Sequence, residues 1–312
     1  MLITVAIPCY RSAETLPNVV GRIKDAFKLR PEFDYEIILA NDGSPDNTYD
    51  VIKTLCAEDG RVKGINLSRN YGQGKARYAA LAYARGDIVV CMDDDGQHPP
   101  EQIFRLIDKV REGYDVVYAA FAKKKESLPR RITSRIHTRI LRWTIKKPRD
   151  LKVSAFYAMD RLIADKLRDN TSPFPATLGY MLSITSKIVN VPIDHQLRIA
   201  GTSGYNFKKR FMLWLDGFVN FSVEPLRMAS FVGFITALVG IAAGIMIVVR
   251  RLFNQHIALG YTSIIATILF VGGMIMIMLG LLGEYVGRIF IVMSNAPQFV
   301  VREAINVEED ER

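Results

Sequence analysis

Two long stretches without a charged side chain constrain this sequence more than any other feature. Residues 228–249 are 22 consecutive uncharged residues, and residues 257–283 are 27 more. At about 1.5 Å of rise per residue, roughly 20 apolar residues in a helix cross the hydrocarbon core of a bilayer. A buried helical hairpin in a soluble protein is the alternative, but two runs of this length favour a membrane. The sequence therefore predicts a two-helix transmembrane hairpin behind a soluble front.

The front of the chain, residues 1–206, alternates strand patterns with helical patterns. The expected strands are 2–8, 35–40, 62–67, 88–92 and 116–120. This alternation predicts an α/β domain with a mostly parallel sheet and helices on both faces. In such sheets ligands gather at the carboxyl ends of the strands. The polar residues that lie just after strands are Tyr10, Asp42, Asn70 and residues 93–95. We expect them to line one crevice.

Three consecutive aspartates, Asp93, Asp94 and Asp95, follow the fourth predicted strand and precede two prolines. Carboxylates this close repel one another unless a positive charge lies among them. Hard oxygen ligands at the end of a buried strand suit Mg²⁺ or Mn²⁺, and Mg²⁺ held by few carboxylates commonly shares its coordination shell with substrate phosphates. From the triplet alone, a solvated acidic turn and a metal–phosphate site are both open.

Positive charge is concentrated in one segment. The chain carries a formal net charge of +9, and between Phe121 and Lys152 there are twelve basic residues against two acidic ones. A helical pattern at 130–146 places isoleucines and Trp143 on one face and arginines on the others. Such a basic amphipathic helix is typical of an anionic membrane surface, although a core-facing helix with a solvated basic face shows the same pattern. Because the charge is segregated in this way, nucleic acid is not the expected partner.

The segment 207–227 has a similar pattern, because Lys208 and Lys209 lie beside aromatic residues directly before the first uncharged stretch. We expect an interfacial amphipathic helix there, transmembrane helices at 228–249 and 257–283, and a cytoplasmic tail at 284–312. The positive-inside rule places the basic front in the cytoplasm and so predicts a multi-pass protein of the inner membrane.

The three cysteines show no CxxC spacing and two of them fall in strand patterns, so we expect reduced thiols. The sequence begins directly with a strand pattern, which predicts no signal peptide. Glycines of the second uncharged stretch offer small faces for helix packing, so a homo-oligomer is open.

Several motifs in order resemble the inverting family 2 glycosyltransferases, and specifically the polyprenyl-phosphate glycosyltransferase branch with two membrane spans in bacteria. The motifs are NDGS at 41–44, SRNYGQ at 68–73, DDDGQHPP at 93–100, Arg198 with GTS at 201–203, PLR at 225–227 and GLLGEYVGR at 280–288. The resemblance covers residues 7 to about 301. It implies a Rossmann-like GT-A domain, followed by amphipathic interface helices and the hairpin.

The resemblance also implies roles at matching positions. Asp93 and Asp95 would hold a divalent metal on the diphosphate of a nucleotide sugar. Asp95, Asp150 and Arg198 would act in catalysis, with Arg198 on the phosphates and Asp150 orienting the acceptor. Residues that bind the nucleotide sugar would be Pro8, Tyr10, Asp42, Asn70, Asp93, Asp94 and Gln97. Residues at the acceptor or membrane would be Arg131, Arg135, Arg139, Lys208 and Lys209.

The expected reaction transfers a sugar, with inversion, from a nucleotide sugar to undecaprenyl phosphate, with uridine as the expected base and Mg²⁺ or Mn²⁺ as cofactor. A phosphate monoester has a second pKa of about 6, so it needs little general-base help as an acceptor. Gly204 stands where the family usually has a lysine, which leaves the sugar undetermined. One alternative is a processive polysaccharide synthase; its family normally has a QxxRW motif, and this sequence lacks the glutamine before Leu141-Arg142-Trp143. The other is a non-catalytic membrane scaffold derived from a transferase.

Overall fold

A computed structural model describes residues 1–312 except 122–146, 175–176, 195–223, 254–259, 295 and 308–312. It contains two compact units, one formed by residues 1–211 with 297–312 and the other by residues 212–296. The amphipathic helix predicted at 130–146 lies outside the described residues. The described part of the helix predicted at 207–227 is residues 224–227, which open the first long helix.

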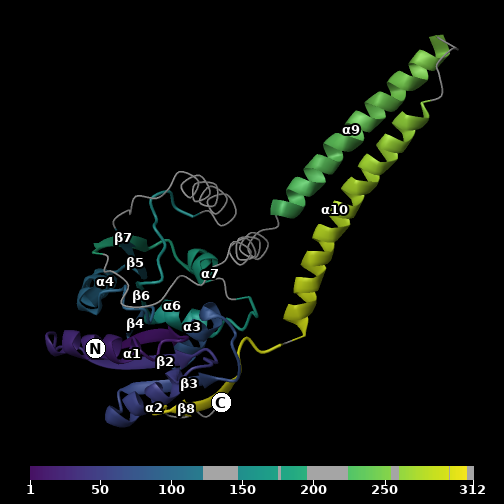
Figure 1. Ribbon diagram of the computed structural model, residues 1–312. Coiled ribbons are helices and arrows are strands. Elements are labelled where there is room, and N and C mark those ends of the chain that lie inside the picture. The colour runs from purple at the N-terminus through teal and green to yellow at the C-terminus, as the bar shows by residue number, and fades with distance from the viewer. Residues whose placement is uncertain (122–146, 175–176, 195–223, 254–259, 295, 308–312) are drawn as a thin grey trace. The chain divides into compact units, whose positions relative to one another are not determined.

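The first unit is built on an eight-stranded sheet with the order β7-β5-β6-β4-β1-β2-β3-β8 (Figure 1). The strands are β1 (Leu2–Cys9), β2 (Asp34–Asn41), β3 (Val62–Leu67), β4 (Ile88–Cys91), β5 (Val116–Phe121), β6 (Tyr157–Asp160), β7 (Ile188–Ile193) and β8 (Val301–Ile305). The pairs β3–β2, β2–β1, β1–β4 and β5–β7 are parallel. The pairs that involve β6 or β8 are antiparallel.

Helices cover both faces of this sheet. One hydrophobic cluster contains residues of α1 (Leu16–Lys28), α2 (Thr48–Glu58) and α4 (Ile103–Arg111), which follows the 3-10 turn η1 (Pro100–Gln102). The other contains residues of α3 (Gln73–Ala82), α6 (Arg161–Arg168) and α7 (Thr177–Ile184). Successive strand residues point to opposite faces, so Val5 and Ile7 of β1 belong to the first cluster and Ala6 to the second.

The predicted mostly parallel α/β sheet is therefore confirmed, and two features of its topology were not predicted. Strand β6 runs antiparallel between β4 and β5, so the predicted strand 116–120 is not a direct neighbour of the strand that ends at the acidic triplet. Strand β8 lies within 284–312, where we expected only a tail, and it pairs with β3. The three cysteines, Cys9, Cys56 and Cys91, are free and buried.

The second unit is a pair of long helices, α9 (Glu224–Phe253) and α10 (Tyr261–Met293). By length and composition both are apolar enough to cross a membrane, over Ala229–Met246 and Phe270–Met293. Helix α10 continues beyond the predicted end at residue 283, where Glu284 and Arg288 form an ion pair at 2.7 Å one turn apart.

The contact between α9 and α10 follows a repeat of three and four residues. The less exposed positions are Ala229, Gly233 and Thr236 on α9 and Met274, Met278, Leu281, Tyr285 and Arg288 on α10. A Cβ built on Gly233 would lie 3.1 Å from Cε of Met278, so the two helices touch there. Spacings of three and four give the seam of a left-handed helix pair. The glycines of α10 at 272, 273, 280 and 283 meet no other side chain in this way.

Candidate functional site

Asp94, the middle aspartate of the triplet, binds the loop after β1. One carboxylate oxygen accepts hydrogen bonds from the backbone N–H of Tyr10 at 3.1 Å and from the hydroxyl of Ser12 at 2.5 Å. Between them, Arg11 has a φ of 55°, and its N–H donates to Oγ of Ser44 at 3.0 Å. Burial raises the pKa of Asp94 to about 6, although the two hydrogen bonds favour its ionised form. The ends of β1 and β4 are thus joined through this carboxylate.

Asp42, at the end of β2, organises the loop after β3. Its carboxylate is 2 % exposed and accepts from the backbone N–H groups of Tyr71 at 2.7 Å and Gly72 at 2.9 Å. Burial raises the pKa of Asp42, and the two amide donors oppose that rise. The next residue, Gly43, has a φ of 60°, and a Cβ there would lie 2.5 Å from the carbonyl carbon of Arg69. Only glycine allows the loops after β2 and β3 to approach this closely.

Asp93 is held by the first turns of α3. Its Oδ1 accepts from Nε2 of Gln73 at 2.7 Å and from Nη2 of Arg77 at 3.3 Å. Residues four apart share a helix face, so both donors reach the same oxygen. Burial alone lowers the pKa of Arg77, but the acidic groups around it, led by Tyr157, raise it above its ordinary value. Arg77 supplies the positive charge that three adjacent carboxylates require.

His98 holds the backbone of the triplet through a hydrogen bond to Asp93. Its Nδ1 accepts a hydrogen bond from the backbone N–H of Asp93 at 2.9 Å, and the residue is 7 % exposed. The imidazole stacks on Phe156 with ring centroids 5.2 Å apart and on Phe121 at 5.8 Å, with interplanar angles of 12° and 9°. An acceptor at Nδ1 requires the tautomer whose proton is on Nε2. The ring geometry thus sets the direction of the acceptor toward Asp93.

Asp95 and Asp150 both lie in the connections between regular elements. One oxygen of Asp95 accepts from the backbone N–H of Gln97 at 3.1 Å, which closes the acidic turn. Asp150 is exposed and directly precedes residues 151–156, the segment that supplies Phe156 to the histidine stack. Asn190 of β7 holds that segment in place. Its Oδ1 accepts from the backbone N–H of Lys152 and its Nδ2 donates to the carbonyl of Lys152, both at 2.7 Å.

The structure brings together most of the predicted site residues that it describes. Pro8 in β1 lies opposite Ala40 of β2, Tyr10 is 43 % exposed, and Asn70 is exposed in the loop that Asp42 holds. The ends of β1 to β4 therefore meet as expected. Predicted residues that lie outside the described ones are Arg131, Arg135, Arg139, Arg198, Lys208 and Lys209.

Four residues with a role at this site were not among the predicted ones: Ser12, Gln73, Arg77 and His98. The pair Gln73 and Arg77 had a signal, since two polar residues four apart open a helix right after a predicted site loop. His98 stands in the DDDGQHPP motif itself, but its hydrogen bond to the triplet backbone depends on the conformation of the turn.

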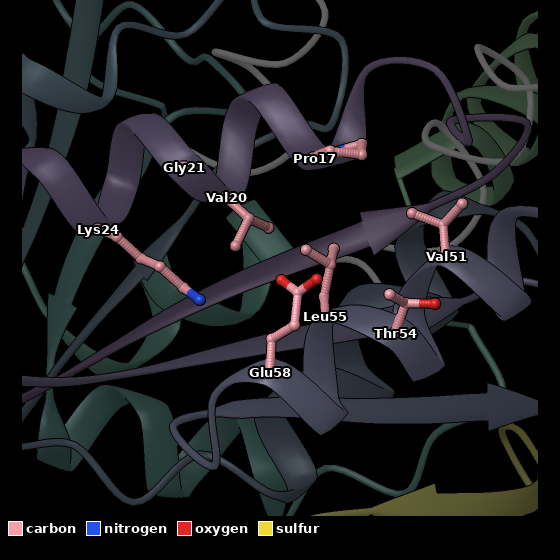
Figure 2. A pocket seen from close by; sticks show the side chains of 8 residues that line it. All are labelled: Pro17, Val20, Gly21, Lys24, Val51, Thr54, Leu55 and Glu58. Atoms are coloured by element: carbon pink, nitrogen blue, oxygen red, sulfur yellow. The ribbon is translucent and has the colours of Figure 1, made fainter.

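A cavity of about 430 Å³ lies elsewhere in the first unit, in the groove between α1 and α2 (Figure 2). Val20 and Lys24 line it from α1, and Leu55 and Glu58 line it from α2. Lys24 also forms an ion pair with Asp59 at 3.1 Å. None of the predicted donor-binding residues is among its lining residues.

Two sequence profiles of known families match this chain. The sequence profile of "Glycosyl transferase family 2" matches residues 4–167, which is more than half of the chain and includes the ends of β1 to β4 with the loops that follow them. The chain belongs to glycosyl transferase family 2. A second profile, "GtrB C-terminal hairpin", matches residues 224–289, the region of α9 and α10.

Similar whole proteins support the same family. The chain is 30 % identical over 306 residues to "Uncharacterized glycosyltransferase YkcC" of Bacillus subtilis, covering 98 % of this chain and 94 % of that protein. It is 31 % identical to "Uncharacterized glycosyltransferase sll0501" of Synechocystis, covering 98 % and 96 %.

A solved structure supports the fold of the first unit, which we call the catalytic unit from here on. Glucosyl-3-phosphoglycerate synthase from Mycobacterium tuberculosis, in complex with Mn²⁺, uridine-diphosphate-glucose and phosphoglyceric acid, matches with a TM-score of 0.52 at 19 % identity. The match covers 70 % of this chain and 77 % of that one. At this identity the likeness concerns the GT-A fold.

Proposed function

We propose that this protein transfers a sugar from a nucleotide sugar to a polyprenyl phosphate, with inversion at the anomeric carbon. One observation carries the proposal: an aspartate triplet, held by the loop after β1 and by the first turns of α3, precedes in the same chain a pair of helices that match the GtrB hairpin. A family 2 transferase supplies the sugar-transfer chemistry. Helices long and apolar enough for a membrane suit an acceptor that cannot leave the bilayer.

A divalent metal fits the residues at the triplet. Among the residues that the structure describes, no group of three or more His, Cys, Asp and Glu side chains is arranged to hold a metal. A metal held by Asp93 and Asp95 would need further ligands, and Mg²⁺ in proteins commonly completes its shell with substrate phosphates and water. When bound, such an ion stabilises negative charge on the leaving diphosphate.

The donor is proposed to be a uridine-diphosphate sugar that lies across the strand ends. The fold neighbour from M. tuberculosis binds Mn²⁺ and uridine-diphosphate-glucose, which supports this class of donor. Pro8, Tyr10, Asp42 and Asn70 would bind the nucleotide, and Asp94 and Gln97 would lie near the sugar and phosphates. Because Asp94 is already hydrogen-bonded to the loop after β1, we assign it the further task of fixing that loop around the donor.

The acceptor side needs positive charge more than a base. A phosphate monoester with a second pKa of about 6 is largely ionised at neutral pH, so it can attack without losing a proton to the protein. Arg198 would stabilise the diphosphate through charge-assisted hydrogen bonds, and Asp150 would orient the acceptor. Arg131, Arg135, Arg139, Lys208 and Lys209 would attract the anionic lipid at the cytoplasmic face of the inner membrane.

Release of nucleoside diphosphate from the purified full-length protein tests this function. Undecaprenyl phosphate and a panel of nucleotide sugars are supplied with Mg²⁺, with Mn²⁺ or with EDTA. We expect metal-dependent release with one donor and a product of opposite anomeric configuration by NMR. Release with no donor in the panel would refute the transferase and favour the scaffold.

Two variants separate the metal site from general damage. Asp95→Asn should lower turnover by about 100-fold or more, because a metal contributes several kcal/mol to charge stabilisation. Asp25→Asn on the exposed surface of α1 is the matched control and should keep full turnover. Full turnover in Asp95→Asn would exclude that residue as a metal ligand.

A further inference from the structure

Strand β8 follows α10 in the chain and belongs to the eight-stranded sheet of the first unit. It pairs antiparallel with β3, with Gly64 opposite Ile305 and Leu67 opposite Val301. The segment around it is fixed at both ends. Nε2 of Gln298 donates to the carbonyl of Ser172 at 2.7 Å. Nδ2 of Asn306 donates to the carbonyls of Cys56 and Val62 at 2.7 and 2.9 Å. Residues 297–307 are thus an ordered part of the first unit.

This segment holds both backbone groups of Ser68, the first residue of the loop after β3. The N–H of Ser68 donates to the carbonyl of Val300 at 2.9 Å. The carbonyl of Ser68 accepts from Nη2 of Arg302 at 3.2 Å. The register between β3 and β8 shifts at this point: Glu303 lies opposite Asn66 and Val301 lies opposite Leu67, so Arg302 has no residue of β3 opposite it. Such an irregularity redirects a side chain, and here it aims the guanidinium at the loop.

The loop that begins at Ser68 reaches the proposed donor site in two further contacts. The hydroxyls of Ser68 and Tyr71 lie 3.0 Å apart. The backbone N–H groups of Tyr71 and Gly72 donate to the carboxylate of Asp42. Arg302 is therefore linked to Asp42 through Ser68 and Tyr71, partly by hydrogen bonds and partly by the covalent structure of these two residues.

We propose that the segment after α10 is a positioning element for the donor-binding loop 68–72, and that Arg302 is its positioning residue. The inference rests on the proposed function in one respect, namely that this loop and Asp42 bind the nucleotide sugar. Arg302 lies outside the matched family 2 region and needs no contact with the donor, since it acts through the backbone of Ser68. The donor affinity of the catalytic unit then depends on residues that follow the hairpin in the chain.

Arg302→Gln tests the proposal, with Glu303→Gln as the matched control. Both changes remove one charge from adjacent, exposed positions of β8, but only Arg302 donates to Ser68. Loss of one hydrogen bond from a charged donor should raise the KM for the nucleotide sugar about threefold to tenfold and leave kcat within about twofold. Arg302→Lys, which keeps a charged donor, should restore part of the difference.

Hydrogen exchange of the full-length protein gives a readout that needs no turnover. The amides of Ser68, Tyr71 and Gly72 should exchange faster in Arg302→Gln and at the unaltered rate in Glu303→Gln. Unchanged exchange in Arg302→Gln, or equal changes of donor KM in both variants, would overturn the positioning role. If the unaltered protein turned over no nucleotide sugar, the proposed function would fail, while the exchange rates would still decide whether Arg302 orders the loop.

Discussion

Replacement of His98 should weaken the acidic site without touching any proposed ligand. Two kinds of contact made by the imidazole can be tested separately: Nδ1 accepts the N–H of Asp93, and the ring stacks on Phe121 and Phe156. His98→Phe keeps an aromatic ring but removes the acceptor. His98→Asn keeps an acceptor atom at the position of Nδ1 but removes the ring. The two variants therefore separate the hydrogen bond from the stacking.

The magnitudes follow from the burial of the group. A buried N–H that loses its acceptor costs about 1–3 kcal/mol, so His98→Phe should lower the free energy of unfolding by that amount. Each aromatic pair contributes about 0.5–1.5 kcal/mol beyond its buried area, so His98→Asn should be destabilised to a similar degree. For a domain of this size, about 1 kcal/mol corresponds to roughly 2–4 °C in Tm.

The two variants should differ in their response to metal. In His98→Phe the turn that carries Asp93 loses its anchor, so the Mn²⁺ concentration for half-maximal rate should rise about tenfold, equivalent to about 1.4 kcal/mol. In His98→Asn this concentration should rise less than threefold, about 0.6 kcal/mol. Thermal unfolding in detergent and a Mn²⁺ titration of turnover measure both effects. Equal metal dependence in His98→Phe and the unaltered protein would refute the anchoring role, whatever the change in Tm.

Three further predictions concern the loops and the core. Asp42→Asn keeps only one acceptor oxygen for two amide donors, and should raise the donor KM about tenfold with little change in kcat, as initial rates would show. Gly43→Ala places a methyl group 2.5 Å from the backbone of Arg69 at a φ of 60°, and should lower Tm by several degrees, whereas Gly21→Ala on α1 meets nothing within 4 Å and should not. Burial raises the pKa of the three thiols, that of Cys56 to about 11, so that at pH 8 only about one thousandth of Cys56 is thiolate. Alkylation should therefore be slow until the protein is unfolded or the pH is raised. Fast labelling of the folded protein would contradict the buried positions of Cys9, Cys56 and Cys91.

The first half of the catalytic unit could be predicted because its signals are local. Strands β1 to β5 are apolar runs bounded by turn residues, and the structure has them within a few residues of the predicted ranges. Site residues at strand ends could be named before the fold was known, since parallel strands deliver their carboxyl ends to one place. The need for a cation beside the triplet was also predictable from charge repulsion.

The remainder depends on contacts between distant residues. Arg77 was not identified as that cation because it lies 16 residues before Asp93 in the sequence. Strand β8 has only five residues, two of which are charged and adjacent, and its pairing with β3 spans more than 230 residues. The predicted span 257–283 follows the uncharged stretch and so stops before Glu284, whereas helix α10 continues to Met293 with Glu284 and Arg288 paired one turn apart.

The position of β8 also has a consequence for the order in which the protein folds. Until the ribosome has made α9, α10 and the residues up to Ile305, β3 is the last strand on its side of the sheet, so the sheet of the first unit cannot be complete before that point. Until then β3 is an open edge strand, whose unpaired backbone groups can pair with another chain and aggregate. A soluble form cut before α9 would keep that edge permanently, so a fusion that joins residue 211 to residue 297 through a flexible linker should be the better-behaved catalytic fragment.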